Sequence, residues 1–197
     1  MTSVPSNLRG VLTVISGPSG VGKTTIVKAV KERLNVIFSV SATTRPKTDQ
    51  ETDGEDYHFL SDEAFESMIA SDGFLEHACV FHKHSYGTPR EPVEEALAEG
   101  KLVILEIDVQ GGMQIRQSMP DALLIFIKPP SEEVLLTRLR GRGRDDEQAI
   151  QCRYAEARSE IENAESSRAY DAFVINDDLE TAIEEICDII RRRGNIG

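Results

Sequence analysis

The chain has 197 residues, 40% of them hydrophobic, which suits one compact domain and excludes a disordered protein. Its 34 acidic and 22 basic residues leave a net charge of −12, and an acidic surface repels nucleic acids and anionic membranes. The three cysteines are widely spaced, the first ten residues lack the apolar stretch of a signal peptide, and no run reaches transmembrane length. We therefore expect a cytoplasmic protein with reduced thiols.

Apolar segments of strand length alternate with helical patterns along most of the chain, as in doubly wound α/β proteins. Their near-continuous apolar character indicates strands of a parallel sheet that is covered on both faces. The predicted strands are residues 11–15, 38–40, 102–107, 123–127 and 173–175. The predicted helices are residues 22–34, 109–118, 131–140 and 179–193. The sequence thus predicts an α/β core around a five-stranded parallel sheet.

Two regions interrupt this alternation. A polar, turn-rich stretch after residue 43 leads into short segments at 57–60 and 74–81 with a helix over 62–71, which predicts an inserted lobe of mixed strands. Residues 139–147 are rich in Arg, Gly and Asp and predict a mobile, positively charged lid. We expect one domain over residues 1–197, divided into a core (10–40, 88–137 and 155–193), a lobe (41–87) and a lid (138–154).

A phosphate-binding loop follows the first predicted strand directly. The segment matches the pattern G-x-x-x-x-G-K-[ST] in its strand–loop–helix context and reads Gly17-Pro18-Ser19-Gly20-Val21-Gly22-Lys23-Thr24. The glycines let the backbone point several N–H groups at phosphate oxygens, and the following helix adds the positive end of its dipole. Lys23 supplies a charge for the β- and γ-phosphates, and the Thr24 hydroxyl is placed to bind Mg²⁺. The motif and the adjacent Thr25 form the predicted ATP site.

Two acidic residues lie at the end of the third predicted strand. Glu106 and Asp108 follow an apolar run, and their spacing of two places them on one face of a strand. The carboxyl ends of parallel strands face the ligand crevice in such folds. We expect these carboxylates either to hold Mg²⁺ through water or to bind the acceptor.

Several further motifs accompany the phosphate loop. In the lobe they are Ser39-Val40-Ser41-Ala42-Thr43-Thr44-Arg45, Asp53-Gly54-Glu55-Asp56-Tyr57-His58-Phe59, Phe74-Leu75-Glu76 and Tyr86-Gly87-Thr88. Elsewhere they are Asp108-Val109-Gln110-Gly111, Pro129-Pro130-Ser131, Arg138-Leu139-Arg140-Gly141-Arg142-Gly143 and Val174-Ile175-Asn176-Asp177-Asp178. Together they resemble the guanylate kinase family over residues 11 to about 192. The resemblance implies a P-loop nucleoside monophosphate kinase, a monomer or homodimer, that transfers the γ-phosphoryl group of ATP to GMP, and to dGMP, with Mg²⁺ in purine metabolism.

The resemblance also implies roles for residues of the lobe. Arg45, Tyr57 and Tyr86 would hold the phosphate of GMP, the arginine through its planar fork of donors. Glu76 would accept hydrogen bonds from N1–H and the 2-amino group of guanine. Adenine has no donor at either place, so a carboxylate there would select guanine. The remaining contacts with the acceptor nucleotide are implied for Ser41, Thr88 and Asp108.

On the donor side the resemblance implies a clamp around the transferring phosphoryl group. Arg138 and Arg142 would form it, with Arg153 in support, because phosphoryl transfer depends on positioning and charge neutralisation. Closure of the lid would exclude water, which would otherwise hydrolyse ATP. Asn176 would lie near the adenine of ATP.

The chain departs from the family pattern at two places. The second arginine that is usual three residues after Arg45 is replaced by Thr48, and Lys47 is expected to supply the lost charge. Because lysine lacks the bidentate fork, GMP should bind more weakly than with the full pattern. The segment over residues 82–85 is one residue longer than the pattern, and Ser85 stands where another tyrosine is usual.

Three other functions are compatible with parts of the sequence. A ribose 1,5-bisphosphate phosphokinase would share the phosphate loop, but Glu76 and Tyr57 favour a purine monophosphate. A guanylate-kinase-like binding module without catalysis typically has a degraded loop and lid, whereas this chain keeps Lys23, Arg138 and Arg142. A P-loop protein that only hydrolyses ATP would not need the acceptor lobe.

Overall fold

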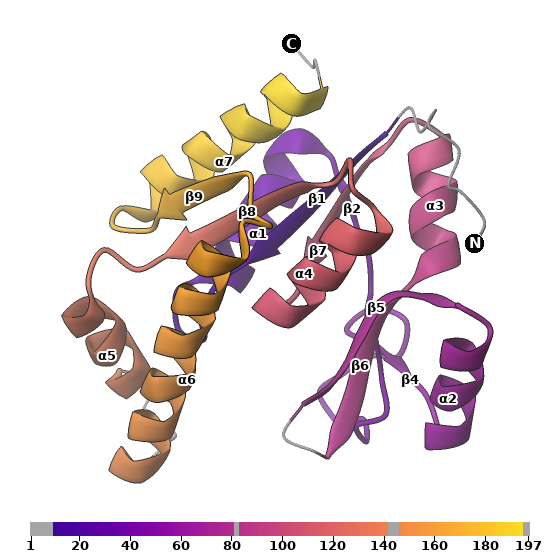
Figure 1. The fold of residues 1–197 in the computed structure, drawn as a ribbon, viewed down its shortest axis with the longest axis horizontal. Helices are drawn as coiled ribbons and strands as arrows, with labels where there is room; N and C mark the ends of the chain where they lie inside the picture. The colour runs from indigo at the N-terminus through magenta and orange to yellow at the C-terminus, as the bar shows by residue number, and fades with distance from the viewer. Residues whose placement is uncertain (1–9, 81–82, 142–145, 195–197) are drawn as a thin grey trace.

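The computed structural model describes residues 10–80, 83–141 and 146–194 and shows an α/β fold (Figure 1). Its main sheet has five parallel strands in the order β2-β7-β1-β8-β9. The strands are β1 (Val11–Ser16), β2 (Ile37–Phe38), β7 (Leu102–Glu106), β8 (Leu123–Lys128) and β9 (Ala172–Ile175). The prediction of a five-stranded parallel core is therefore confirmed.

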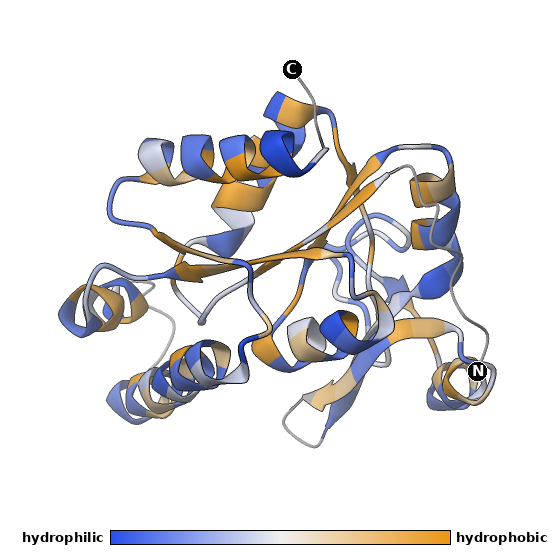
Figure 2. Cartoon of the chain, turned by 45° about the horizontal axis from the view of Figure 1, so that its top comes forward, coloured by the Kyte–Doolittle hydropathy of each residue, from blue (hydrophilic) through white to orange (hydrophobic). Residues whose placement is uncertain are grey.

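Helices cover both faces of this sheet, which explains the continuous apolar runs of its strands (Figure 2). On β8, Leu124 and Phe126 pack toward one group of helices, while Ile125 and Ile127 pack toward the other. The first group is α3 (Arg90–Ala98), α4 (Val109–Ser118) and α6 (Glu147–Ser167). The second group is α1 (Lys23–Leu34) and α7 (Leu179–Gly194). The short α5 (Glu132–Arg140) packs on α6 beside the sheet.

A second, mixed sheet forms the inserted lobe. Its strands, in the order β4-β3-β6-β5, are β3 (Ala42–Thr43), β4 (His58–Phe59), β5 (Phe74–Val80) and β6 (His84–Pro89). The helix α2 (Asp62–Ala70) closes a small apolar cluster in which Phe65 stacks on Phe74 with ring centroids 4.4 Å apart. The prediction of a mixed-strand lobe after the second core strand is confirmed.

Two local predictions were wrong. The second core strand is Ile37–Phe38 rather than residues 38–40, because the strand register ends at Phe38 and Ser39 adds only one hydrogen bond to Ile104 before the chain turns into the lobe. Asp108 does not share a strand face with Glu106, because β7 ends at Glu106 and Asp108 is the N-cap of α4, where its side chain accepts from the Gly111 N–H.

The predicted lid, residues 138–154, contains the end of α5, the connection between the two helices and the start of α6. The helix α5 ends at Arg140 and α6 begins at Glu147 after Asp146, whose side chain caps it by accepting from the Ala149 N–H at 2.8 Å. Residues 142–145, including Arg142, lie outside the described residues. None of the described helices is long and apolar enough to cross a membrane. The division into core, lobe and lid stays a prediction.

Candidate active site

The phosphate loop connects β1 to α1 and bends through glycines with positive φ angles. Gly20 has φ 87° and Gly22 has φ 101°, values that L-residues with a side chain rarely adopt. A Cβ atom on Gly22 would also lie 2.8 Å from Nδ2 of Asn176. The Lys23 ammonium donates a hydrogen bond to the Gly17 carbonyl across the loop. The loop therefore has the tight curve that brings backbone N–H groups and the lysine to one point.

The sheet brings a hydroxyl and a carboxylate together beside this loop. The Thr24 hydroxyl, in the first turn of α1, donates to Oε1 of Glu106 at 2.7 Å. The two residues are 82 positions apart and meet because β1 and β7 are parallel neighbours. Both offer hard oxygen ligands, the kind that Mg²⁺ prefers, so the residues present fit a magnesium ion.

Two cavities adjoin each other between the loop and the lobe. The larger, of about 510 Å³, reaches the phosphate loop at Lys23 and Thr24. The smaller, of about 260 Å³, reaches the lobe at Glu76 and Tyr86. The same five residues line both: Ser41, Tyr57, Glu106, Ile107 and Asp108. Most residues predicted for the acceptor site therefore line these adjoining cavities, the larger of which reaches the phosphate loop, whereas Arg45 and Thr88 line neither.

A buried carboxylate lies at the inner end of the smaller cavity. Glu76 is 6% exposed, stands opposite Thr88 in the β5–β6 pair, and accepts a hydrogen bond from the Thr88 hydroxyl at 2.7 Å. Its Oε2 lies so close to α4 that a Cβ atom on Gly111 would be 2.8 Å away. Burial, with the nearby Asp108 as a smaller cause, raises the pKa of Glu76 from 4.5 to about 7. The environment therefore keeps this carboxyl close to its titration point at neutral pH.

The register of the lobe hairpin places three predicted acceptor residues on one face. Glu76 pairs with Thr88, Ala78 with Tyr86 and Val80 with His84 without a shift between them. Because residues two apart on a strand point to the same face, Glu76, Tyr86 and Thr88 face the same region. The one-residue insertion near residues 82–85 stays a prediction.

Aromatic rings surround the predicted phosphate ligand Arg45. Its guanidinium carbon lies 5.5 Å from the ring centroid of Tyr57 and 5.7 Å from that of Phe59. Tyr57 and Tyr86 pack edge to face with centroids 5.8 Å apart. Hydrogen bonds to Glu51 and to Tyr86 raise the pKa of Arg45, so its guanidinium remains positively charged. Arg45, Tyr57 and Tyr86 are thus brought together as predicted.

A carboxylate that sequence reasoning missed also holds Arg45. Glu51 pairs with the guanidinium at 2.5 Å (Nη2 to Oε1) and 3.0 Å (Nη1 to Oε2), and the pKa of Glu51 falls to about 2 chiefly through this contact. Thr48 gives Oε2 of Glu51 two further hydrogen bonds, from its N–H at 2.9 Å and its hydroxyl at 2.8 Å. Lys47 donates to the Glu51 backbone carbonyl at 2.8 Å. The only sequence signal was the position of Glu51 in the polar turn six residues after Arg45.

A third cavity, of about 240 Å³, lies beside the glycines of the phosphate loop. Asn176 and Arg138 line it, and Arg138 donates to the Asn176 carbonyl at 2.9 Å. The Asn176 amide donates to the Val21 carbonyl at 2.7 Å. Oδ1 of Asn176 and Nη1 of Arg138 are buried without a hydrogen-bond partner among the described residues. These orphaned atoms are typical of a site that a polar ligand completes.

The predicted arginine clamp is only partly within the described residues. Arg153 of α6 donates to the Ser19 hydroxyl of the phosphate loop at 2.6 Å. Arg138 contacts Asn176 as described above, beside a cavity that Lys23 and Thr24 do not line. Arg142 lies outside the described residues. A further acid on α6, Glu160, was not expected from the sequence: burial raises its pKa, while Lys23 and the Ser19 N–H act against the rise.

Comparisons with known proteins show the family of this chain. The family model described as guanylate kinase matches residues 9–193. A guanylate kinase of Gloeobacter violaceus is 52% identical over 89% of this chain and 84% of its own length, and one of Thermus thermophilus is 45% identical over 96% and 86%. The crystal structure of a guanylate kinase from Anaplasma phagocytophilum superposes with a TM-score of 0.75 at 33% identity, covering 94% of this chain and 86% of that one. The chain therefore belongs to the guanylate kinase family of nucleoside monophosphate kinases.

Proposed function

We propose that this protein transfers the γ-phosphoryl group of ATP to GMP, and to dGMP, and releases ADP and the nucleoside diphosphate. The observation that carries the proposal is the buried Glu76 carboxylate at one end of a space whose other end is the phosphate loop. A carboxylate can accept hydrogen bonds from guanine N1–H and the 2-amino group together. A base without these donors would leave the buried acceptor unsatisfied, which is the basis of strong discrimination.

The remaining acceptor contacts are proposed for residues in and beside these cavities. Arg45, which lies beside Tyr57, would bind the GMP phosphate with the N–H groups that Glu51, Pro46 and Tyr86 do not occupy. The hydroxyls of Tyr57 and Tyr86 would add neutral donors. Ser41, Thr88 and Asp108 would complete the nucleotide contacts.

The donor nucleotide would bind across the phosphate loop. Its adenine would lie in the cavity beside Asn176, and its phosphates would lie on the loop N–H groups of residues 17–25 with Lys23 at the β- and γ-phosphates. Thr24 would hold Mg²⁺, with Glu106 and Asp108 acting through water. The ion would neutralise charge on the phosphates. Arg138, Arg142 and Arg153 would neutralise the rest and exclude water as the lid closes.

An acceptor screen tests the proposal. The purified protein with ATP and Mg²⁺ is offered GMP, dGMP, AMP, CMP, UMP or ribose 1,5-bisphosphate, and ADP release is followed. Fast turnover with GMP alone among the ribonucleotides is the expected result. Equal rates with AMP or UMP would contradict the role of Glu76, and ATP consumption without an acceptor would indicate a hydrolase. No consumption at all would favour a binding module.

The pH dependence of GMP binding provides a separate prediction. Because burial raises the pKa of Glu76 to about 7, the free protein loses its carboxylate acceptor as the pH falls through 7. We expect the KM for GMP to rise below pH 7, by up to about tenfold per pH unit, while the KM for ATP changes less. Steady-state kinetics between pH 5.5 and 8.5 measure this. In Glu76→Gln the only remaining pH dependence of the KM for GMP should come from the GMP phosphate, which titrates near pH 6. A pH profile of Glu76→Gln equal to that of the wild type would contradict the assignment.

Lys47 offers a second prediction on the acceptor side. Its ammonium holds the backbone of the turn that presents Glu51 to Arg45, and it stands next to the position of the missing arginine. We expect Lys47→Ala to raise the KM for GMP by about threefold, because it removes a positive charge and loosens this turn. The matched control is Lys83→Ala, an exposed lysine in the hairpin turn of the same lobe. An unchanged KM for GMP in Lys47→Ala would refute the compensation.

The same proposal extends to the setting of the enzyme. The net charge of −12 supports small-molecule substrates rather than nucleic acid as partners. Free rather than paired cysteines support a reducing, cytoplasmic location. We also propose the division into core, lobe and lid described from the sequence, and a monomer or homodimer as the active form. Light scattering of the purified protein measures the last point.

A further inference from the structure

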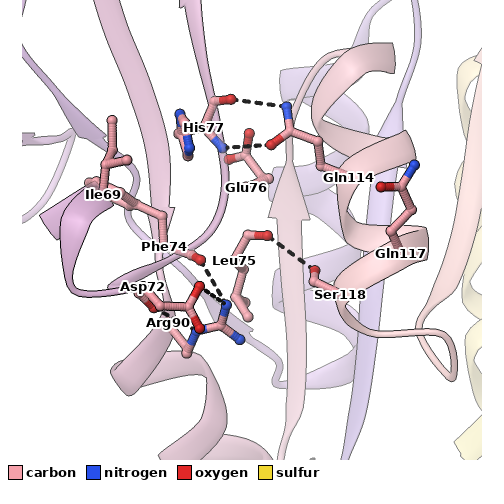
Figure 3. Close-up of a pocket in the computed structure, with 10 residues that line it drawn as sticks. All are labelled: Ile69, Asp72, Phe74, Leu75, Glu76, His77, Arg90, Gln114, Gln117 and Ser118. Carbon is pink, nitrogen blue, oxygen red and sulfur yellow. Dashed lines mark hydrogen bonds and ion pairs between the residues drawn. The ribbon is translucent and has the colours of Figure 1, made fainter. Parts of the chain in front are cut away.

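The strand that carries Glu76 has an open edge. In the lobe sheet β5 is an outer strand and pairs with β6 on one side only. Such an edge leaves alternate backbone N–H and C=O groups without a strand partner. Next to Glu76 the outward-facing groups are those of Leu75 and His77, which bond to side chains of the neighbouring helix α4. The core helix α4 runs along this edge (Figure 3).

Gln114 of α4 takes the place of the missing strand. Its Oε1 accepts a hydrogen bond from the His77 N–H at 3.1 Å, and its Nε2 donates to the His77 carbonyl at 2.9 Å (Figure 3). A glutamine amide has the same donor and acceptor as a peptide group, so it can satisfy both groups of one residue. One turn further on, the Ser118 hydroxyl donates to the Leu75 carbonyl at 3.1 Å.

The side chain of Glu76 rests on the same helix. Its Oε2 lies against Gly111, in the first turn of α4, where a Cβ atom would be only 2.8 Å away. The Gly111 N–H is in turn held by Asp108 at 2.8 Å. The backbone next to Glu76 is therefore hydrogen-bonded to a helix of the core, and its carboxylate lies against the same helix, although the residue belongs to a strand of the lobe.

This helix is directly connected to the phosphate-binding end of the site. Only Ile107 and Asp108 separate it from β7, whose last residue Glu106 accepts from Thr24 of the phosphate loop. The position of the Glu76 carboxylate relative to the reacting phosphates thus depends on how α4 holds β5. His77 itself is exposed, so water can satisfy its backbone groups if the glutamine amide is removed. Losing the contact should loosen the strand without unfolding the domain.

We propose that Gln114 is a positioning residue for guanine recognition: by holding the His77 backbone it sets the place of the Glu76 carboxylate. The inference rests on the proposed function, which makes Glu76 the acceptor for guanine. It predicts a defect that concerns the base alone, because Gln114 contacts neither the phosphate ligands of the lobe nor the phosphate loop in the described structure.

The test compares Gln114→Met with Gln117→Met. Methionine keeps the length and packing of glutamine but has no amide. Gln117 lies on the same helix and lines the same pocket between α4 and β5 as Gln114 (Figure 3). Within the described part of the chain it makes no hydrogen bond to β5. For each protein kcat/KM is measured with GMP and with IMP, which lacks the 2-amino group, together with the KM for ATP. Amide hydrogen exchange of His77 is followed in parallel.

Gln114→Met should lower the GMP-to-IMP ratio of kcat/KM about tenfold and speed up exchange of the His77 amide, with the KM for ATP unchanged. Gln117→Met should match the wild type. An unchanged ratio in Gln114→Met would overturn the proposal, and so would an equal loss with GMP, IMP and ATP, which would indicate a general effect on the fold. A wild type that does not phosphorylate GMP would instead refute the proposed function and, with it, guanine as the ligand of Glu76.

Discussion

Lys23→Ala is expected to lower kcat for phosphoryl transfer by about 10³-fold, an effect of the size seen when a single charge-stabilising donor is removed from a transition state. The ammonium donates to the Gly17 carbonyl inside the loop, on the wall of the cavity that continues to the acceptor side. In the transition state it would neutralise charge that spreads over the transferring phosphoryl group. Single-turnover measurements with saturating ATP and GMP separate this effect from nucleotide binding.

The control for this change is Lys101→Ala. Lys101 precedes β7, is exposed and pairs with Glu99, so it tests the loss of one lysine without the loop. We expect kcat in Lys101→Ala within twofold of the wild type, and thermal unfolding of both variants close to that of the wild type. If Lys23→Ala retained more than about a tenth of kcat, the phosphate loop would not perform the assigned chemistry.

Glu76→Gln is expected to lower kcat/KM for GMP by about 10²-fold, with little change in the KM for ATP. Glutamine keeps the volume of glutamate and still offers one oxygen to the Thr88 hydroxyl. It replaces the second acceptor by an NH₂ group that faces the donors of guanine. GMP would lose one hydrogen bond and meet a donor opposite a donor. The measurement is a comparison of GMP and AMP kinetics, and an unchanged preference for GMP would contradict the assignment.

The same variant should gain stability where it loses activity. The pKa of the Glu76 carboxyl is raised in the folded protein from its ordinary 4.5 to about 7. Its contribution to the stability of the fold is therefore complete below pH 4.5 and is lost as the pH rises through about 7. The neutral glutamine has no such loss. We therefore expect the free energy of unfolding of Glu76→Gln at pH 8 to exceed that of the wild type by up to about 3 kcal/mol. The difference should vanish near pH 4. Denaturant titrations at both pH values measure it, with exposed Glu66→Gln as the matched control.

Thr48 and Glu51 show how the folded lobe accommodates the loss of the arginine that usually follows Arg45 by three residues. The sequence shows only that an arginine is missing, and charge alone pointed to Lys47 as a replacement. In the folded lobe Thr48 gives two hydrogen bonds to Glu51, which holds Arg45 by two contacts. Thr48, which stands where a second phosphate-binding arginine is usual, thus supports Arg45 through Glu51. This is possible because the turn brings Glu51 back to Arg45, six residues earlier.

Local patterns in the sequence by themselves determined the phosphate loop and the alternation of strands and helices. A loop between a strand and a helix uses consecutive residues, and a strand buried on both faces must be apolar throughout, so neither depends on distant partners. The ends of elements were less well defined: Asp108 is a helix cap rather than a strand residue, since hydrogen bonds and not hydropathy end β7.

Which side chains meet depends on the tertiary structure. The contact of Thr24 with Glu106 spans 82 residues and depends on the order of the sheet, and the raised pKa of Glu76 depends on its burial against α4. The hold of Gln114 on His77 depends on which strand of the lobe has the open edge. Such contacts arise from strand order, register and packing, which are collective properties of the folded chain and leave no pattern among neighbouring residues.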